Sequence, residues 1–166
     1  GYGVGVLDCC ALALDDEKIL AVIEERKPRI IGISATTYAL SGALELTKAI
    51  RKSFPEQLII LGGSHANVAG KETTHQYDVF DLVAVGSDGE YTALEIIESY
   101  AESGYSRKTF LENDQLISSI DGIMYNRFGE TIENSPRAFI QDLDELPFPA
   151  RDLFPLERYV PLPNQY

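Results

Sequence analysis

Short apolar runs alternate with helical patterns along most of this chain, and this alternation constrains its fold more than any other feature. Apolar residues fill 30–33, 58–61 and 82–85 without polar interruption, and each run is followed by small or hydroxylic residues. Uninterrupted apolar runs are typical of strands buried on both faces, and helical connections require parallel pairing. The sequence therefore predicts an α/β fold with a doubly wound, Rossmann-like or flavodoxin-like parallel sheet.

The pattern also predicts the individual elements of this sheet. We expect strands at 4–8, 30–34, 58–61 and 82–85. We expect a first helix that begins at the acidic run 15–17 and is closed by Pro28, and further helices at about 42–53, 70–76 and 91–103, with Ser41 as the N-cap of the second. A fifth strand is usual in such a sheet, and we place it before residue 1. The opening Gly1-Tyr2-Gly3, which has no initiator Met, suggests a chain taken from a larger protein.

The pattern changes after about residue 104. Strand-like runs at 123–126 and 131–134 flank a loop that contains Gly129, which predicts a β-hairpin. Five prolines follow between 142 and 166 and exclude a long helix or a central strand there. We expect an α/β domain over 1–106, a C-terminal β-hairpin appendage over 107–141 and a Pro-rich extended linker over 142–166.

Composition and charge exclude several classes of function. The net charge is −12, and residues 84–166 hold 15 of the 26 acidic residues and 6 of the 14 basic ones. Binding to nucleic acid or to an anionic membrane requires a cationic surface, so neither partner is expected. No apolar run is long enough to span a membrane. The adjacent Cys9 and Cys10 form no disulfide framework, which favours a reducing, cytoplasmic setting.

Four loops follow the predicted strands, and in an open parallel sheet these loops surround the ligand site. Glycines admit a ligand close to the backbone, and hydroxyl groups supply neutral hydrogen bonds. Such a rim suits a large, flat, partly apolar cofactor with a polar tail. The candidate binding residues are Asp8, Ser34, Thr36, Thr37, Gly62, Gly63, His65, Gly86, Gly89 and Glu90.

Each of these residues also has a plain structural interpretation. Gly62-Gly63 can be a tight strand exit, the hydroxyl residues can be turn and capping residues, and His65 can lie on the surface. Two histidines, His65 and His75, do not make a catalytic triad. No Walker loop and no G-x-G-x-x-G precedes the first helix, and no lysine of the kind a phospho-receiver domain needs follows Val85.

Taken in order, the loops resemble the cobalamin-binding domain of cobalamin-dependent radical S-adenosylmethionine proteins. The resemblance covers nearly the whole chain and is most specific in the Gly-Gly-x-His loop at 62–65 and in the connector at 142–152. The subgroup it resembles most contains anaerobic magnesium-protoporphyrin IX monomethyl ester cyclase and related methyltransferases. The matching stretches are 6–8, 28–37, 59–66, 81–86, 89–92, 121–125 and 142–152.

Three departures from the family pattern bear on this interpretation. The family motif Asp-x-His-x-x-Gly, whose histidine coordinates cobalt, here has Cys10 and Ala13 at its last two key positions. The Gly-Glu-Gly-Glu loop is replaced by the longer Gly86–Glu90, and the three-cysteine motif for an iron–sulfur cluster is absent. Histidine coordination of cobalt is therefore not expected.

The resemblance implies a cobalamin-binding module without catalytic or metal-ligating residues of its own. S-adenosylmethionine and a 4Fe-4S cluster would belong to a radical domain in the same full-length chain, which would perform methyl transfer or anaerobic oxidative cyclisation of a tetrapyrrole-like substrate. The alternative is a cofactor-free α/β docking scaffold that has lost cobalamin binding. A fragment with an unpaired sheet edge can also associate with itself.

Overall fold

The computed structural model describes residues 2–86 and 89–159. The chain forms two compact units. One unit spans residues 27–140 and contains the sheet, and the other combines the first 26 residues with the segment after residue 140. None of the described helices combines the length and the apolar character that crossing a membrane requires.

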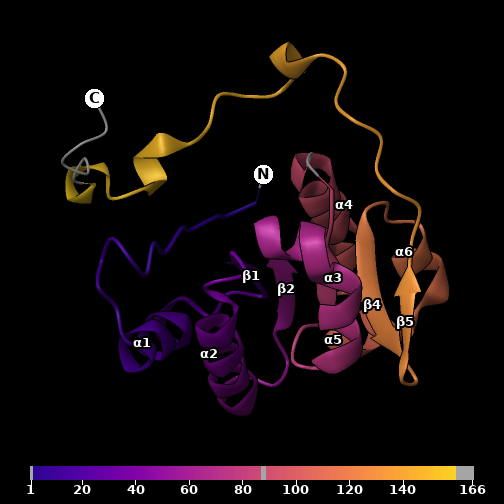
Figure 1. The fold of residues 1–166 in the computed structure, drawn as a ribbon, viewed down its shortest axis with the longest axis horizontal. Helices are drawn as coiled ribbons and strands as arrows, with labels where there is room; N and C mark the ends of the chain where they lie inside the picture. Colours follow the sequence, from indigo (N-terminus) through magenta and orange to yellow (C-terminus); the bar gives the residue numbers. More distant parts are fainter. Residues whose placement is uncertain (1, 87–88, 160–166) are drawn as a thin grey trace. The chain divides into compact units, whose positions relative to one another are not determined.

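The unit of residues 27–140 is built on a mixed, five-stranded sheet in the order β1-β2-β3-β4-β5 (Figure 1). The strands β1 (Ile30–Ser34), β2 (Leu58–Gly62) and β3 (Leu82–Ala84) are parallel, as expected from their helical connections. The expected hairpin is β4 (Ile123–Arg127) and β5 (Glu130–Glu133). Strand β4 pairs antiparallel with β3, so the hairpin continues the sheet. The predicted α/β flavodoxin-like fold is confirmed.

Helices cover both faces of this sheet. Between the parallel strands run α2 (Leu40–Ser53) and α3 (Ser64–Gln76), and α4 (Gly89–Glu102), α5 (Arg107–Glu112) and α6 (Asp114–Ser118) follow β3. Gly70 of α3 lies against Val83, whereas the neighbouring Leu82 packs with Ile96 of α4. Successive strand residues face opposite sides, so α3 and α4 cover opposite faces (Figure 1).

The starts of α2 and α3 differ from the prediction in ways that the local hydrogen bonds and backbone explain. The second helix starts at Leu40 with Ala39 as its N-cap, so Ser41 lies inside the helix and the predicted cap is wrong. The Thr36 hydroxyl and carbonyl both accept from the Ala39 N–H, which fixes the earlier turn. Helix α3 starts at Ser64 rather than at residue 70, because two short helices join at a kink at Ala69. Its first turn, like α5 and α6, carries no periodic signal in the sequence.

The expected strand at 4–8 is wrong, because residues 2–8 adopt no strand conformation. A strand requires a hydrogen-bonding neighbour, and the opening residues Gly1, Gly3 and Gly5 weaken extended pairing. Val4 is 66% exposed instead of buried. These residues belong to the unit formed by the first 26 residues and the segment after residue 140. In its first segment, a turn at 8–14 precedes α1 (Asp16–Arg26). Its second segment forms three 3-10 helices, at Leu143–Glu145, Arg151–Leu153 and Leu156–Arg158.

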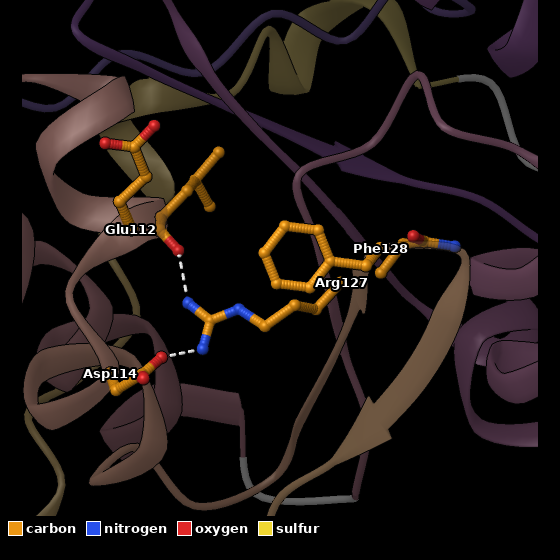
Figure 2. A pocket seen from close by; sticks show the side chains of 6 residues that line it. Glu112, Asp114, Arg127 and Phe128 are labelled. Atoms are coloured by element: carbon orange, nitrogen blue, oxygen red, sulfur yellow. Dashed lines mark hydrogen bonds and ion pairs between the residues drawn. The ribbon is translucent and has the colours of Figure 1, made fainter.

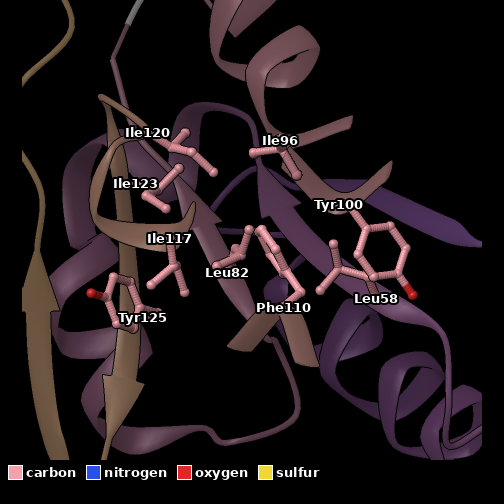
Figure 3. Close-up of a cluster of buried hydrophobic side chains, with 9 residues drawn as sticks. All are labelled: Leu58, Leu82, Ile96, Tyr100, Phe110, Ile117, Ile120, Ile123 and Tyr125. Atoms are coloured by element: carbon pink, nitrogen blue, oxygen red, sulfur yellow. The ribbon is translucent and has the colours of Figure 1, made fainter. Parts of the chain in front are cut away.

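The main hydrophobic core lies between the sheet and the helices α4, α5 and α6 (Figure 3). Tyr100 is central to it, with its ring edge-on to Phe110 at a centroid distance of 5.5 Å and to Tyr105 at 5.7 Å. Each fully buried side chain of this size contributes about 1.5–3 kcal/mol to folding. The core consists of Leu58, Leu82, Ile96, Tyr100, Phe110, Ile117, Ile120, Ile123 and Tyr125.

A buried carboxylate joins the elements at the amino ends of the strands. Asp81, directly before β3, accepts from Arg51 at 2.7 Å through Oδ2 and from Arg107 at 2.6 and 2.8 Å through Oδ1. Oδ2 also accepts from the backbone N–H of Ile59 at 2.8 Å. The carboxylate is satisfied in a site that water hardly reaches, since only 2% of the Asp81 side chain is exposed. It therefore ties α2, β2 and α5 together.

Replacement of Asp81 should destabilise the fold. We expect Asp81→Asn to lower the free energy of unfolding by about 2–3 kcal/mol, because two guanidinium groups lose their charge partner. Glu133→Gln removes the exposed ion pair with Lys71 at 3.9 Å and should cost less than about 0.5 kcal/mol. Urea denaturation followed by circular dichroism measures both, and equal losses in the two variants would contradict a structural role for Asp81.

Candidate cofactor-binding groove

A groove of about 630 Å³ lies over one face of the sheet beside α4. Its floor is formed by residues that are neighbours across the strands: Gly32 of β1 pairs with Ile60 of β2, and Ser34 pairs with Gly62. Ala93 and Ile97, one turn apart on α4, form part of its wall. The small side chains at the carboxyl ends of the strands leave this space. The lining comprises Ile30, Gly32, Ile33, Ser34, Ile60, Gly62, Gly63, Ser64, Asn67, Ala84, Val85, Gly86, Gly89, Ala93, Ile96 and Ile97.

Gly63 connects the loops that follow β1 and β2. Its φ of +89° and ψ of −175° belong to a region that only glycine adopts readily. A Cβ on Gly63 would lie 2.8 Å from the Ala35 carbonyl oxygen and 2.8 Å from Ser34 Oγ. On either side, the Ala35 N–H donates to Gly62 O at 3.1 Å and the His65 N–H donates to Ala35 O at 3.0 Å. The two loops are thus held in contact at the mouth of the groove.

The loop after β3 joins the same mouth through Gly86. Its φ is +108°, and its N–H donates to Asn67 Oδ1 of α3 at 2.9 Å. Gly89 begins α4 and also lines the groove, whereas Glu90 is exposed in the first turn of that helix. Ser87 and Asp88, which belong to the predicted loop, lie outside the described residues. Five candidate residues therefore share one groove: Ser34, Gly62, Gly63, Gly86 and Gly89.

His65 lies in the first turn of α3 rather than on a loop, and only 4% of it is exposed. Its Nδ1 is 3.2 Å from Thr37 Oγ1 and its Nε2 is 2.8 Å from Thr73 Oγ1. Both ring nitrogens therefore have hydroxyl partners inside the protein. The side chain links Thr37 in the β1 loop to the body of α3. Thr36 and Thr37 are exposed and lie outside the lining of the groove.

Asp8 belongs to the other unit, where it organises the turn at 8–14. Its Oδ1 accepts from the Ala11 N–H at 2.9 Å, and its Oδ2 accepts from the Tyr159 hydroxyl at 2.7 Å. These bonds hold the pKa of Asp8 below its usual value, and the same carboxylate raises the pKa of Tyr159. Ala13, at the glycine position of the family motif, has a φ of +48°. The turn thus keeps a left-handed residue there without glycine.

A smaller hollow of about 290 Å³ lies at the hairpin and contains none of the predicted residues. Figure 2 shows Arg127 extending across it toward α5 and α6. Its guanidinium donates to Leu111 O at 2.7 Å and pairs with Asp114. These contacts use the guanidinium group of Arg127 for structural bonds within the protein, and they attach β4 to α5 and α6. The larger groove is the better candidate for a cofactor.

Sequence reasoning missed several residues that line the groove. Gly32 interrupts an otherwise apolar strand, and that interruption is a signal for a close approach to the sheet. Ser64 and Asn67 are missed because the sequence pattern places the start of α3 too late. Ala93 and Ile97 fall in a predicted helix, but no sequence pattern distinguishes the groove wall from the core.

Open α/β sheets with glycine-rich loops at the carboxyl ends of their strands form a class of cofactor-binding domains. Within that class, the B12 binding domain family matches residues 1–97, more than half of the chain. The chain belongs to the B12-binding domain family. Its relatives align with most of this chain, but they are much longer proteins.

Two proteins illustrate this relationship. An uncharacterized methyltransferase of Pyrococcus horikoshii is 28% identical over 95% of this chain and 32% of its own length. The anaerobic magnesium-protoporphyrin IX monomethyl ester cyclase of a Synechocystis species is 28% identical over 87% of this chain and 27% of its own length. This chain therefore spans about a third or less of these relatives.

A solved structure shows the same fold. It is the apo, selenomethionine-labelled form of the cobalamin-dependent S-adenosylmethionine radical enzyme OxsB, with a TM-score of 0.63. The match covers 87% of this chain and 18% of the other chain, at 21% sequence identity.

Substitution of the two adjacent glycines should change stability by different amounts, with a loss at Gly63 and no loss at Gly62. Gly63→Ala forces a side chain into a left-handed position against backbone atoms and should lower the free energy of unfolding by about 2 kcal/mol or more. Gly62→Ala meets no atom within 4 Å and should be neutral or stabilising by up to about 1 kcal/mol. Thermal and urea unfolding measure both changes, and a harmless Gly63→Ala would refute the close contact with Ala35.

The two cysteines should react at different rates. Cys10 is exposed, whereas Cys9 is half-buried, and burial, followed by the charges of Cys10 and Asp8, raises the pKa of its thiol. We expect iodoacetamide at pH 8 to modify Cys10 first. Mass spectrometry over time gives the two rates, with Cys10→Ser and Cys9→Ser as matched controls. Faster modification of Cys9 would contradict the described turn.

Proposed function

We propose that this chain is the cobalamin-binding module of a larger radical S-adenosylmethionine enzyme and that the groove beside α4 holds the nucleotide tail of cobalamin. The observation that supports this assignment is the apolar groove beneath a rim of glycine and hydroxyl residues. The tail carries a flat aromatic base, which suits the floor at Gly32, Ile60 and Ala84. Its phosphate and ribose suit backbone N–H groups and hydroxyls at the mouth.

The predicted residues then take separate roles around the cofactor. Gly62 and Gly63 admit the tail between the loops, and Ser34 supplies a hydroxyl at the mouth. Thr36 and Thr37, which follow Ser34 in the β1 loop, would hydrogen-bond the tail outside the groove, and Gly86, Gly89 and Glu90 would line the rim of the corrin ring. His65 positions Thr37 from inside the protein instead of touching the ring. Asp8 belongs to the other unit, where it shapes the turn that carries Cys9 and Cys10, and it has no assigned contact with the groove.

Coordination of cobalt by a histidine is not part of this proposal. Cys10 stands where the family motif has histidine, and His65 would have to break a hydrogen bond to Thr37 or Thr73 before it could coordinate a metal. The module therefore holds cobalamin through its tail and its ring edges. The bound cofactor supplies the alkyl-transfer or redox chemistry, and the protein supplies position and solvent exclusion.

The proposal for the whole protein places the chemistry in another domain. Within the division expected from sequence, residues 1–106 would carry the cofactor loops, 107–141 add the hairpin to the same sheet and core, and 142–166 would form a linker toward a radical domain in the same chain. That domain would bind S-adenosylmethionine and a 4Fe-4S cluster and perform methyl transfer or anaerobic oxidative cyclisation in the cytoplasm. The length of the relatives supports a further domain, since this chain spans at most 32% of those described above.

Filling the groove should weaken cobalamin binding. A Cβ on Gly62 would meet no atom within 4 Å, and Gly62 faces the groove, so Gly62→Leu should fold normally and occupy the space for the tail. We expect the dissociation constant for hydroxocobalamin, from its visible spectrum, to rise by about tenfold or more. Gly42→Leu, on the exposed side of α2 with equally open surroundings, is the matched control.

Two results would count against the proposal. Equal affinity of the Gly62→Leu and Gly42→Leu variants for hydroxocobalamin would show that the nucleotide tail does not bind in the groove. Absence of any spectral change or co-elution with the unsubstituted chain would instead favour the cofactor-free docking scaffold, for which the replacement of the motif histidine by Cys10 is the supporting observation.

A further inference from the structure

The floor of the groove offers almost no hydrogen-bonding groups. Backbone N–H and C=O groups of β1, β2 and β3 point along the plane of the sheet, toward neighbouring strands or, for β1, partly toward the sheet edge, and not up from the floor. The side chains that rise from this face are aliphatic or absent, as at Ile30, Gly32, Ile60 and Ala84. A ligand on this floor therefore meets an apolar surface.

The wall formed by α4 has the same character. It presents Ala93, Ile96 and Ile97, and of the described residues that line the groove none is charged. The polar side chains Ser34, Ser64 and Asn67 are confined to the mouth. The Oδ1 of Asn67 accepts from the Gly86 N–H at 2.9 Å, which leaves its Nδ2 group to donate at the mouth. Hydrogen bonding in the groove is thus possible at the mouth and not at depth.

We propose that this groove selects cobamides by the chemistry of the lower base, accepting apolar aromatic bases and rejecting purines. This inference rests on the proposed function, because it concerns the ligand of the same groove. Cobamides share one corrin ring but differ in the base at the end of the nucleotide tail. A base that enters the groove first breaks its bond to cobalt, and dimethylbenzimidazole then has one ring nitrogen without a bonded group, whereas adenine has three such ring nitrogens and an amino group.

The selection follows from desolvation. Each polar group that enters the groove without a partner loses its hydrogen bonds to water, and nothing on the floor replaces them. The benzimidazole base buries its methyl groups and ring faces on Ile60 and Ile97 and gives up little hydration. A phenolic base gives up still less, because its oxygen is bonded to the ribose. The expected order of affinity is therefore benzimidazole and phenolyl forms above the adeninyl form.

Four probes test this selection with the unsubstituted chain: hydroxocobalamin, a phenolyl cobamide, an adeninyl cobamide and cobinamide, which lacks the tail. We expect the adeninyl form to bind about tenfold or more weakly than hydroxocobalamin, with the phenolyl form close to hydroxocobalamin. Visible spectra and retention during gel filtration give the dissociation constants without any enzyme activity.

A substitution that adds a hydrogen-bonding group to the wall should reduce the selection. Ala93 is exposed on α4 and lines the groove, so Ala93→Gln should fold and narrow the difference between the adeninyl and benzimidazole forms by at least about threefold. Leu94→Gln is the matched control, because Leu94 is 41% exposed on the same helix and does not line the groove. It should leave the difference unchanged.

The outcomes separate this inference from the proposed function. If adeninyl cobamide and hydroxocobalamin bind equally and both bind more tightly than cobinamide, the selection is refuted while the tail remains bound. If all four probes bind equally, the tail does not use the groove and the inference is overturned. If no probe binds to the folded chain, the proposed function fails and this inference fails with it.

Discussion

The contact between Gly63 and Ala35 is the constraint on which the arrangement of the site depends. Two parallel strands end side by side, and their loops touch because the second one carries no Cβ at the point of closest approach. The left-handed backbone of Gly63 then turns β2 directly into α3. A side chain there would separate the loops and alter the mouth of the groove. The positions of Ser34 and Ser64 at that mouth depend on this one residue.

The same turn determines the role of His65. Because α3 starts immediately after Gly63, His65 points into the protein and reaches both Thr37 and Thr73. Its hydrogen bonds attach the β1 loop to the kinked helix, and Asn67 attaches the β3 loop to that helix. The first turn of α3 therefore organises all three loops. The buried Asp81 fixes the opposite ends of the strands in a similar way, through α2 and α5.

The strands at 30–34, 58–61 and 82–85, the hairpin and the mouth of the groove are predictable from sequence, because continuous apolar runs and paired glycines carry strong local signals. The absence of a strand at 4–8 is not predictable from sequence, because a strand depends on a hydrogen-bonding partner that the local sequence does not specify. The start of α3 is predicted too late because Ser64–Val68 has no helical periodicity. The polarity of His65 suggests exposure, and only the fold shows that two threonines satisfy its ring. The groove wall at Ala93 and Ile97 depends on how α4 packs, which periodicity leaves open.

The groove itself distinguishes physically between the two functional interpretations. In a cofactor-free scaffold, glycines at positions 32 and 62 would leave Ile60 and Ile97 in contact with water and would contribute no burial. Larger apolar side chains there would increase stability, since Gly62 and Gly32 both have open space around a Cβ. A bound aromatic tail instead covers these isoleucines and recovers that burial in the complex. Glycine at positions 32 and 62 therefore costs burial in an empty groove but allows burial against a bound ligand. This supports cobalamin binding over the cofactor-free docking scaffold.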